Sequence, residues 1–275
     1  MTSTSVRSFE VVLGEKAGQP VSDQTESTQV TWFGHSTVLI RMGETTILTD
    51  PLLRGRAAHL RRRVPLLEED WPAAVDAILI SHLHLDHCDL PTLRRLGRHI
   101  PLLVPVGAGT WLRGRGFTNV VELPVGADHV VESVVVTAVP AEHPGRRWPL
   151  RPDAETIGFL VRGPKTFYFA GDTELFDGMG SLGVELDVAL IPVWGWGRSL
   201  GTGHMDPARA AEALRLQQPR IAIPIHWGTL HPYGTAIRDK RFLEDPPNQF
   251  AELARSIAPS VDVRIMQPGE TIVIE

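Results

Sequence analysis

The sequence predicts an α+β fold in which two β-sheets are covered by helices. Short β-rich runs recur from Val30 to the end of the chain, and a few helix-type segments stand between them. No long linker, repeat or low-complexity tract interrupts this series. The chain has 275 residues, of which 43% are hydrophobic and 21% are charged, so it is long enough to bury a substantial core. We therefore expect a single domain over residues 30–275.

Residues 1–29 are rich in Ser, Thr, Gln and Gly and contain one short apolar run, Phe9 to Leu13. They predict an N-terminal arm with one edge strand. From Val30 the chain changes to β-rich runs separated by turn residues, and 162–165 reads as a hairpin turn. The expected strands are 30–33, 37–40, 46–49, 77–80, 101–104, 134–139, 157–161, 166–170, 188–192, 221–225, 261–266 and 271–274. The first three predict a meander.

Two helix starts carry capping signals. Asp89 precedes Leu90-Pro91, which predicts an N-cap followed by proline in the first turn. Asp206-Pro207 opens a second helix that extends through Gln217, with apolar residues at helical spacing. A third helix is expected over 248–257.

The bulk composition excludes some classes of protein. A formal net charge of -5 argues against nucleic-acid binding by broad electrostatics. Cys88 is the one cysteine, so no intrachain disulfide can form and a reducing cytoplasm is expected. The first ten residues lack the apolar core of an export signal, and no window reaches the roughly 18 apolar residues of a spanning helix. We expect neither export nor membrane insertion.

The residues that carry chemistry begin at the end of the 77–80 run, in His82-Leu83-His84-Leu85-Asp86-His87. A His-x-His pair can hold a divalent cation through two neutral nitrogens, and the Asp-His that follows can turn to a second cation. A solvated loop that happens to be rich in histidine is the weaker interpretation. Two cations need a bridging group and further donors. The motif therefore predicts more ligands elsewhere, at strand ends.

Three other expected strands end on such residues. His143 follows the 134–139 strand, Gly171-Asp172 follows the 166–170 strand, and His226 follows the 221–225 strand. Each alone has an ordinary interpretation as a surface histidine, a turn aspartate or a core histidine. Their ordered recurrence at strand ends favours a metal site and metal-assisted hydrolysis.

Together these motifs resemble the signature of the metallo-β-lactamase superfamily over roughly Val30 to Tyr233. The resemblance implies a four-layer αβ/βα sandwich with the metal site at one edge of the two sheets. It assigns His82, His84 and His143 to a first metal ion, Asp86, His87 and His226 to a second, and Asp172 to the bridge. It also implies that Asp50, in Thr49-Asp50-Pro51, orients a ligand histidine.

Three further segments resemble one branch of that superfamily: 31–40, 49–51 and Gly203-His204-Met205-Asp206-Pro207. The branch contains N-acyl-phosphatidylethanolamine phospholipase D and L-ascorbate-6-phosphate lactonase, and 225–229 strengthens the first likeness. Both relatives act on phosphate-bearing substrates. Since residues 1–29 have no long apolar or amphipathic element for docking on a bilayer, we expect a soluble substrate here.

The expected nucleophile is a hydroxide held between two divalent cations, which attacks phosphorus or a carbonyl carbon. Zinc is the first expectation for the metal, with manganese and iron(II) as alternatives. The catalytic candidates are Asp86, His204 and His35. We expect His204 and His35 to contact substrate oxygen or to protonate the leaving group, although local packing remains an alternative for both.

Arginines near the motif loops predict a small anionic substrate, a phosphodiester, phosphoester or lactone. These are 54, 56, 61–63, Arg146 and Arg147, and a solvated charged face is the alternative interpretation. Trp194 and Trp196 predict a pocket wall, or else core packing. A nuclease of the same fold and a catalytically silent metal-binding scaffold remain as other functions. Cys88 is expected to be a buried, inert thiol, and a homo-oligomer is compatible with the sequence.

Overall fold

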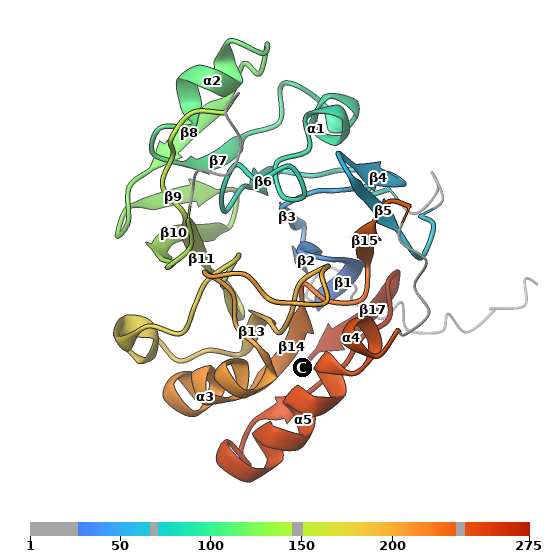
Figure 1. Cartoon of the computed structure of the whole chain (residues 1–275). Coiled ribbons are helices and arrows are strands. Elements are labelled where there is room, and N and C mark those ends of the chain that lie inside the picture. Colours follow the sequence, from blue (N-terminus) through green and yellow to red (C-terminus); the bar gives the residue numbers. More distant parts are fainter. Residues whose placement is uncertain (1–26, 67–70, 145–150, 235–239) are drawn as a thin grey trace, which may run out of the picture.

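The computed structural model describes residues 27–66, 71–144, 151–234 and 240–275, and its strands form two large sheets (Figure 1). The first sheet runs, in spatial order, through β17 (Glu270–Ile274), β1 (Thr28–Gly34), β2 (Thr37–Met42), β3 (Thr45–Thr49), β6 (Ala77–Leu79), β7 (Leu102–Pro105) and β8 (Val120–Leu123). The second runs through β16 (Asp262–Val263), β14 (Ile221–Ile225), β13 (Val188–Pro192), β12 (Thr166–Phe169), β11 (Ile157–Arg162), β10 (Val134–Pro140) and β9 (Asp128–Val131).

Each large sheet is antiparallel on one side and parallel on the other. The strands β17, β1, β2 and β3 pair antiparallel, whereas β3, β6, β7 and β8 pair parallel. The second sheet repeats this plan, with β9 to β12 antiparallel and β12, β13, β14 and β16 parallel. Parallel strands end at the same edge of a sheet, so the loops after β3, β6, β12 and β14 gather there.

The core lies between the two sheets and beneath their helices. The main apolar cluster joins Val30 and Ile40 of the first sheet to Phe159 and Phe169 of the second. In β6 and the residue that follows it, Ala77 and Leu79 belong to this cluster, whereas Ile78 and Ile80 belong to another on the outer face of the first sheet. Both faces of β6 are thus buried, which explains why its sequence is a continuous apolar run rather than an alternating one.

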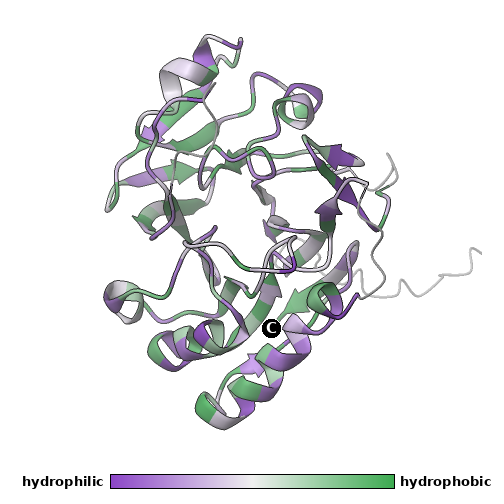
Figure 2. Ribbon diagram, in the orientation of Figure 1, coloured by the Kyte–Doolittle hydropathy of each residue, from purple (hydrophilic) through white to green (hydrophobic). Residues whose placement is uncertain are grey.

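Helices form the two outer layers (Figure 1). Helices α1 (Leu90–Leu96) and α2 (Gly109–Arg113) cover the first sheet, and α3 (Pro207–Gln217) and α5 (Pro246–Ile257) lie on the side of the second. A 3₁₀ turn, η2 (Asp177–Gly180), and the short α4 (Arg241–Glu244) adjoin them. Apolar residues concentrate in the strands, and the helices show mixed faces (Figure 2). The expected four-layer sandwich is confirmed.

The expected caps are present. The side chain of Asp89 accepts a hydrogen bond from the backbone N–H of Thr92, and Asp206 accepts one from that of Arg209. Within the described ranges, no helix is long and apolar enough to cross a bilayer, and the longest helix, α5, has 12 residues.

Several boundaries differ from those expected. The strand expected over 261–266 is reduced to β16, and α5 begins at Pro246 rather than at residue 248. A third sheet, formed by β15 (Leu230–Pro232), β5 (Leu60–Arg62) and β4 (Arg56–Ala57), was not predicted. Strands of two or three residues are too short to show an alternating pattern. The strand expected at Phe9 to Leu13 lies outside the described residues, so the division at residue 29 stays a prediction.

Candidate metal centre

The histidine motif lies at the sandwich edge where strands of both sheets end. Its loop follows β6 and precedes α1, so the rigid strand and the capped helix hold it at both ends. The loops after β10, β12 and β14 bring His143, Asp172 and His226 to the same edge. All seven residues expected to bind metal meet there in two groups.

The first group consists of His82, His84, His143 and Asp172, whose ligand atoms lie within 4.8 Å of one another. His84 Nδ1 lies 2.8 Å from His82 Nε2 and 3.1 Å from His143 Nε2. Nitrogens on a tetrahedral zinc ion are about 3.3 Å apart, given zinc–nitrogen bonds of about 2.0–2.1 Å. The three nitrogens therefore converge at nearly the spacing that one cation requires.

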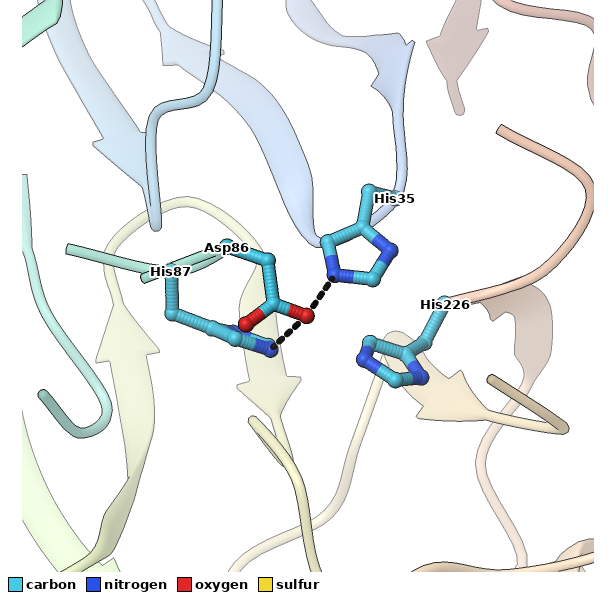
Figure 3. A group of neighbouring side chains, drawn as sticks. All are labelled: His35, Asp86, His87 and His226. Atoms are coloured by element: carbon cyan, nitrogen blue, oxygen red, sulfur yellow. Dashed lines mark hydrogen bonds and ion pairs between the residues drawn. The ribbon is translucent and has the colours of Figure 1, made fainter. Parts of the chain in front are cut away.

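The second group consists of Asp86, His87 and His226, together with His35 (Figure 3). Asp172 reaches this group as well as the first. Its Oδ2 lies 3.2 Å from His87 Nε2, and its Oδ1 lies 3.1 Å from His226 Nε2. The same Oδ2 lies 3.9 Å from the Nε2 atoms of His82 and His143. Asp172 thus occupies the position between the groups that a bridging carboxylate needs.

In most of these histidines, the Nδ1 atom donates a hydrogen bond to a nearby acceptor. His87 Nδ1 donates to Asp50 Oδ2 at 2.7 Å, His226 Nδ1 donates to the carbonyl of Trp194 at 2.7 Å, and His143 Nδ1 donates to the carbonyl of Gly203. His82 Nδ1 donates to the hydroxyl of Ser81, which in turn donates to Asp50. Fixing the proton on Nδ1 leaves Nε2 with a lone pair directed at the centre, the arrangement typical of metal-bound histidines.

The charge state of the centre suits a divalent cation. Burial, reinforced by His143, lowers the pKa of His84 to about 3, and burial also holds the pKa of His82 well below its usual value. Burial raises the pKa of Asp172, but His226 and His87 outweigh it and hold that pKa well below its ordinary range. Burial lowers the pKa of His87, but Asp172 and Asp50 outweigh it and hold that pKa well above its ordinary value, so a bound cation would take the place of a proton on this ring. Imidazole nitrogens beside an ionised carboxylate are donors that zinc, manganese and iron(II) accept.

Buried atoms without partners support the same conclusion. His87 Nε2, His226 Nε2 and Asp172 Oδ1 are buried and have no well-directed hydrogen bond within the described part of the chain, although the two nitrogens lie 3.2 and 3.1 Å from Asp172. Leaving such atoms unpaired costs about 1–3 kcal/mol each. These two nitrogens and this oxygen face one another across the centre, so one cation could pair with all three. The residues present therefore fit a metal centre.

A cavity of about 100 Å³ opens onto the centre. Its polar side is formed by His84, Asp86, Asp172 and His204, and its apolar side by Ala57, Ala58, Leu60, Leu85 and Trp196, with His59 beside Trp196. His204 Nε2 lies 3.3 Å from Asp172 Oδ2. Among the described residues that line the cavity, none carries a lysine or arginine side chain.

Comparison with known proteins identifies the family. The family model described as the beta-lactamase superfamily domain matches residues 45–227, more than half of the chain. The chain belongs to the metallo-β-lactamase superfamily. It is similar to a metal-dependent hydrolase of Opitutus terrae, with 32% identity over 89% of this chain and 99% of the relative. It is also 30% identical to the N-acyl-phosphatidylethanolamine-hydrolyzing phospholipase D 1 of Caenorhabditis elegans, over 81% of this chain and 68% of that protein.

Other relatives extend beyond the region shared with this chain. The chain spans 62% of the length of an uncharacterized protein of Mycobacterium tuberculosis, to which it is 31% identical over 76% of its own length. Among solved structures, a metallo hydrolase from Ignicoccus hospitalis has a TM-score of 0.71 and 25% identity, over 90% of this chain and 99% of that chain. These likenesses place the chain among the metal-dependent hydrolases of the superfamily.

The structure places the other expected site residues in different surroundings. Trp196 and His204 line the cavity, whereas Trp194 supplies its carbonyl to His226 and donates its indole N–H to Gly197. His35 is 1% exposed and does not line the cavity, so in this structure it is placed behind Asp86 rather than facing a substrate. Arg146 and Arg147 lie outside the described residues.

The arginines near the motif loops mostly have structural partners. Arg54 forms a two-point ion pair with Asp89, and Arg62 is buried and donates to the carbonyls of Phe33 and Leu52. Neither is free to bind an anion in the cavity. Cys88 is fully buried, and burial raises the pKa of its thiol to about 11, which agrees with the expectation of an inert residue.

Sequence reasoning missed three contributors to the site. Ser81 links His82 to Asp50, Thr229 holds the backbone of His35, and the 56–62 hairpin forms the apolar wall of the cavity. The position of Ser81 between a strand and the motif was a usable signal. The roles of Thr229 and the hairpin depend on contacts across many residues of sequence, which no local pattern shows.

Proposed function

We propose that this chain is a binuclear metal-dependent hydrolase that acts on a small soluble substrate, an anionic phosphodiester, phosphoester or lactone. The observation that carries this proposal is the position of Asp172, whose two carboxylate oxygens face histidines of both groups. Two divalent cations, zinc first and manganese or iron(II) as alternatives, would supply an activated water and positive charge at the reacting bond. His82, His84 and His143 would hold one cation, Asp86, His87 and His226 the other.

His204 is the residue placed to move a proton. Its Nδ1 is directed at the carbonyls of Gly201 and Thr202, so Nδ1 keeps its hydrogen and Nε2 is the atom that exchanges protons. That Nε2 faces the cavity beside Asp172. We assign His204 to protonating the leaving group or to donating a hydrogen bond to a substrate oxygen.

The cavity favours a small substrate with an apolar portion. Trp196 and the hairpin residues Ala57 and Leu60 form one side, and the reacting side is formed by the histidines and carboxylates. Because Arg54 and Arg62 are held by other partners, the described residues would meet the charge of an anionic substrate at the metal centre. Arg146 and Arg147 stay predicted substrate contacts. We also propose that the protein is located in the cytoplasm.

The test combines metal analysis with turnover. Protein purified without added metal is measured for bound ions, and bis(p-nitrophenyl) phosphate, a lactone panel and generic RNA and DNA are assayed with and without chelator. We expect two ions per chain and chelator-sensitive turnover of a phosphodiester or lactone. Cleavage of nucleic acid alone would instead favour a nuclease, and absence of metal and turnover after reloading with zinc or manganese would favour a silent scaffold.

Asp172→Ala tests the bridge directly. It should lower metal occupancy and abolish hydrolysis together, whereas Asp262→Ala, which removes an exposed carboxylate, should change neither. Retained turnover with two bound ions in Asp172→Ala would refute the bridging assignment.

A further inference from the structure

The neighbours of His35 distinguish it from the other histidines of the centre. Its side chain is buried, and the described contacts of its ring are with Asp86, His87 and His226 (Figure 3). The ring centroids of His35 and His226 are 4.1 Å apart, and those of His35 and His87 are 5.1 Å apart. These three neighbours are the residues assigned to the second cation.

The protons on His35 are also arranged differently. His82, His87, His143 and His226 each fix a proton on Nδ1, which leaves Nε2 as the atom that a metal ion can bind. His35 instead places Nε2 3.1 Å from Asp86 Oδ2, an acceptor, so Nε2 carries the proton and donates it in a hydrogen bond. A nitrogen that donates N–H has no lone pair for a metal ion. His35 is therefore suited to orient a ligand rather than to be one.

The backbone of His35 is fixed independently of its ring. Its N–H donates to Thr229 Oγ1 at 2.7 Å, and its carbonyl accepts from the indole of Trp32 and from the backbone N–H of His226, both at 2.9 Å. His35 and His226 both have a positive φ, 55° and 61°, which few residues adopt without such support. His35 thus connects the loop after β1 to the loop after β14 through backbone hydrogen bonds.

We propose that His35 is a positioning residue that builds the second cation site. Its N–H donates to Asp86 Oδ2, the oxygen that also lies 3.9 Å from His87 Nε2, and so fixes the orientation of that carboxylate beside the second group. Its carbonyl accepts from the backbone N–H of His226 and fixes the position of that residue. The inference rests on the proposed binuclear function. It predicts a selective defect: without the His35 side chain, the second ion binds more weakly, whereas the affinity for the first, held by His82, His84 and His143, is unchanged.

The test compares two replacements of one side chain. The amide of His35→Gln can place an N–H near the position of Nε2, whereas His35→Leu removes the donor, and both keep the backbone contacts and share the positive φ. Metal-free proteins are titrated with zinc against a chromophoric chelator, and bound ions are counted by elemental analysis. We expect His35→Leu to weaken the second ion about 10- to 100-fold, and His35→Gln to stay within about threefold of the parent chain.

The outcomes separate this inference from the proposed function. Two ions bound with parental affinity in His35→Leu would overturn the inference alone, as would equal losses in the Leu and Gln variants. Fewer than two ions in the parent chain would overturn the binuclear function and the inference with it. If His35→Leu does not fold, the pair Thr229→Val and Thr229→Ser replaces it, since only the serine keeps the hydroxyl that holds the N–H of His35. Unchanged second-ion affinity in Thr229→Val would then count against the inference.

Discussion

Asn in place of Asp50 should weaken metal binding by changing which nitrogen of His87 carries the proton. Asp50 is fully buried, with Oδ1 accepting from the backbone N–H of Ser81 at 2.8 Å. Its Oδ2 accepts from His87 Nδ1 at 2.7 Å and from the hydroxyl of Ser81. The backbone N–H of Ser81 can only donate, so the amide oxygen of an asparagine must stay at Oδ1 and its NH₂ group must take the place of Oδ2.

The NH₂ group then faces the protonated Nδ1 of His87, so two hydrogen-bond donors oppose each other. His87 can resolve the conflict by placing its proton on Nε2, the atom beside Asp172, which leaves Nε2 without a lone pair for a cation. Loss of such a partner typically costs 10- to 100-fold in metal affinity, about 1.4–2.7 kcal/mol. We therefore expect Asp50→Asn to lose that much affinity for the ion bound by His87, with little change in molecular shape.

The assay is a zinc titration of the metal-free protein against a chromophoric chelator, with thermal unfolding to verify folding. Asp76→Asn is the matched control, because Asp76 accepts from the backbone N–H of Thr46 at a distance from the centre. It should bind metal as the parent chain does. Parental affinity for two ions in Asp50→Asn would refute the argument that Asp50 sets the tautomer of His87.

Three further outcomes are expected. Trp196→Ala should raise KM about tenfold with a smaller effect on kcat, because it removes the largest apolar side chain of the cavity wall; steady-state kinetics measure both, and an unchanged KM would exclude contact with substrate. Arg62→Leu should lower the free energy of unfolding by about 2–4 kcal/mol in urea titrations, since it leaves two carbonyls without their donor, whereas the exposed Arg61→Leu should have little effect. Burial raises the pKa of Cys88 from 9.0 to about 11, so the folded chain keeps this proton longer than the unfolded chain. The protonated thiol therefore contributes roughly 3 kcal/mol to the free energy of unfolding below pH 9, and this contribution is lost as the pH rises to about 11. Cys88→Ala should flatten that decline in stability, and an equal decline in both proteins would contradict it.

The layers of the fold were predictable because each depends on a local pattern. The continuous apolar run of β6 indicated a strand, which the structure buries on both faces, and Asp89 and Asp206 marked helix starts through capping that involves neighbouring residues. The small third sheet was not predictable, because its strands are two or three residues long and derive their stability from pairing across the chain. The arginines at 54, 56 and 61–63 were interpreted as groups that bind an anionic substrate or form a solvated face, whereas Arg62 is a buried structural donor.

The sequence by itself determined which residues could bind metal, because ligand chemistry belongs to the side chain and its spacing along one loop. It therefore indicated His82 to His87, and, by strand-end position, His143, Asp172 and His226. Only the tertiary structure decided what each histidine can do, since the position of a proton depends on the acceptor that lies opposite each ring nitrogen. Such acceptors are distant in sequence: Asp50 for His87, the carbonyl of Trp194 for His226, and Asp86 for His35. Because Asp86 accepts a hydrogen bond from His35 Nε2, His35 is a hydrogen-bond donor, unlike the neighbouring histidines that we assign as metal ligands.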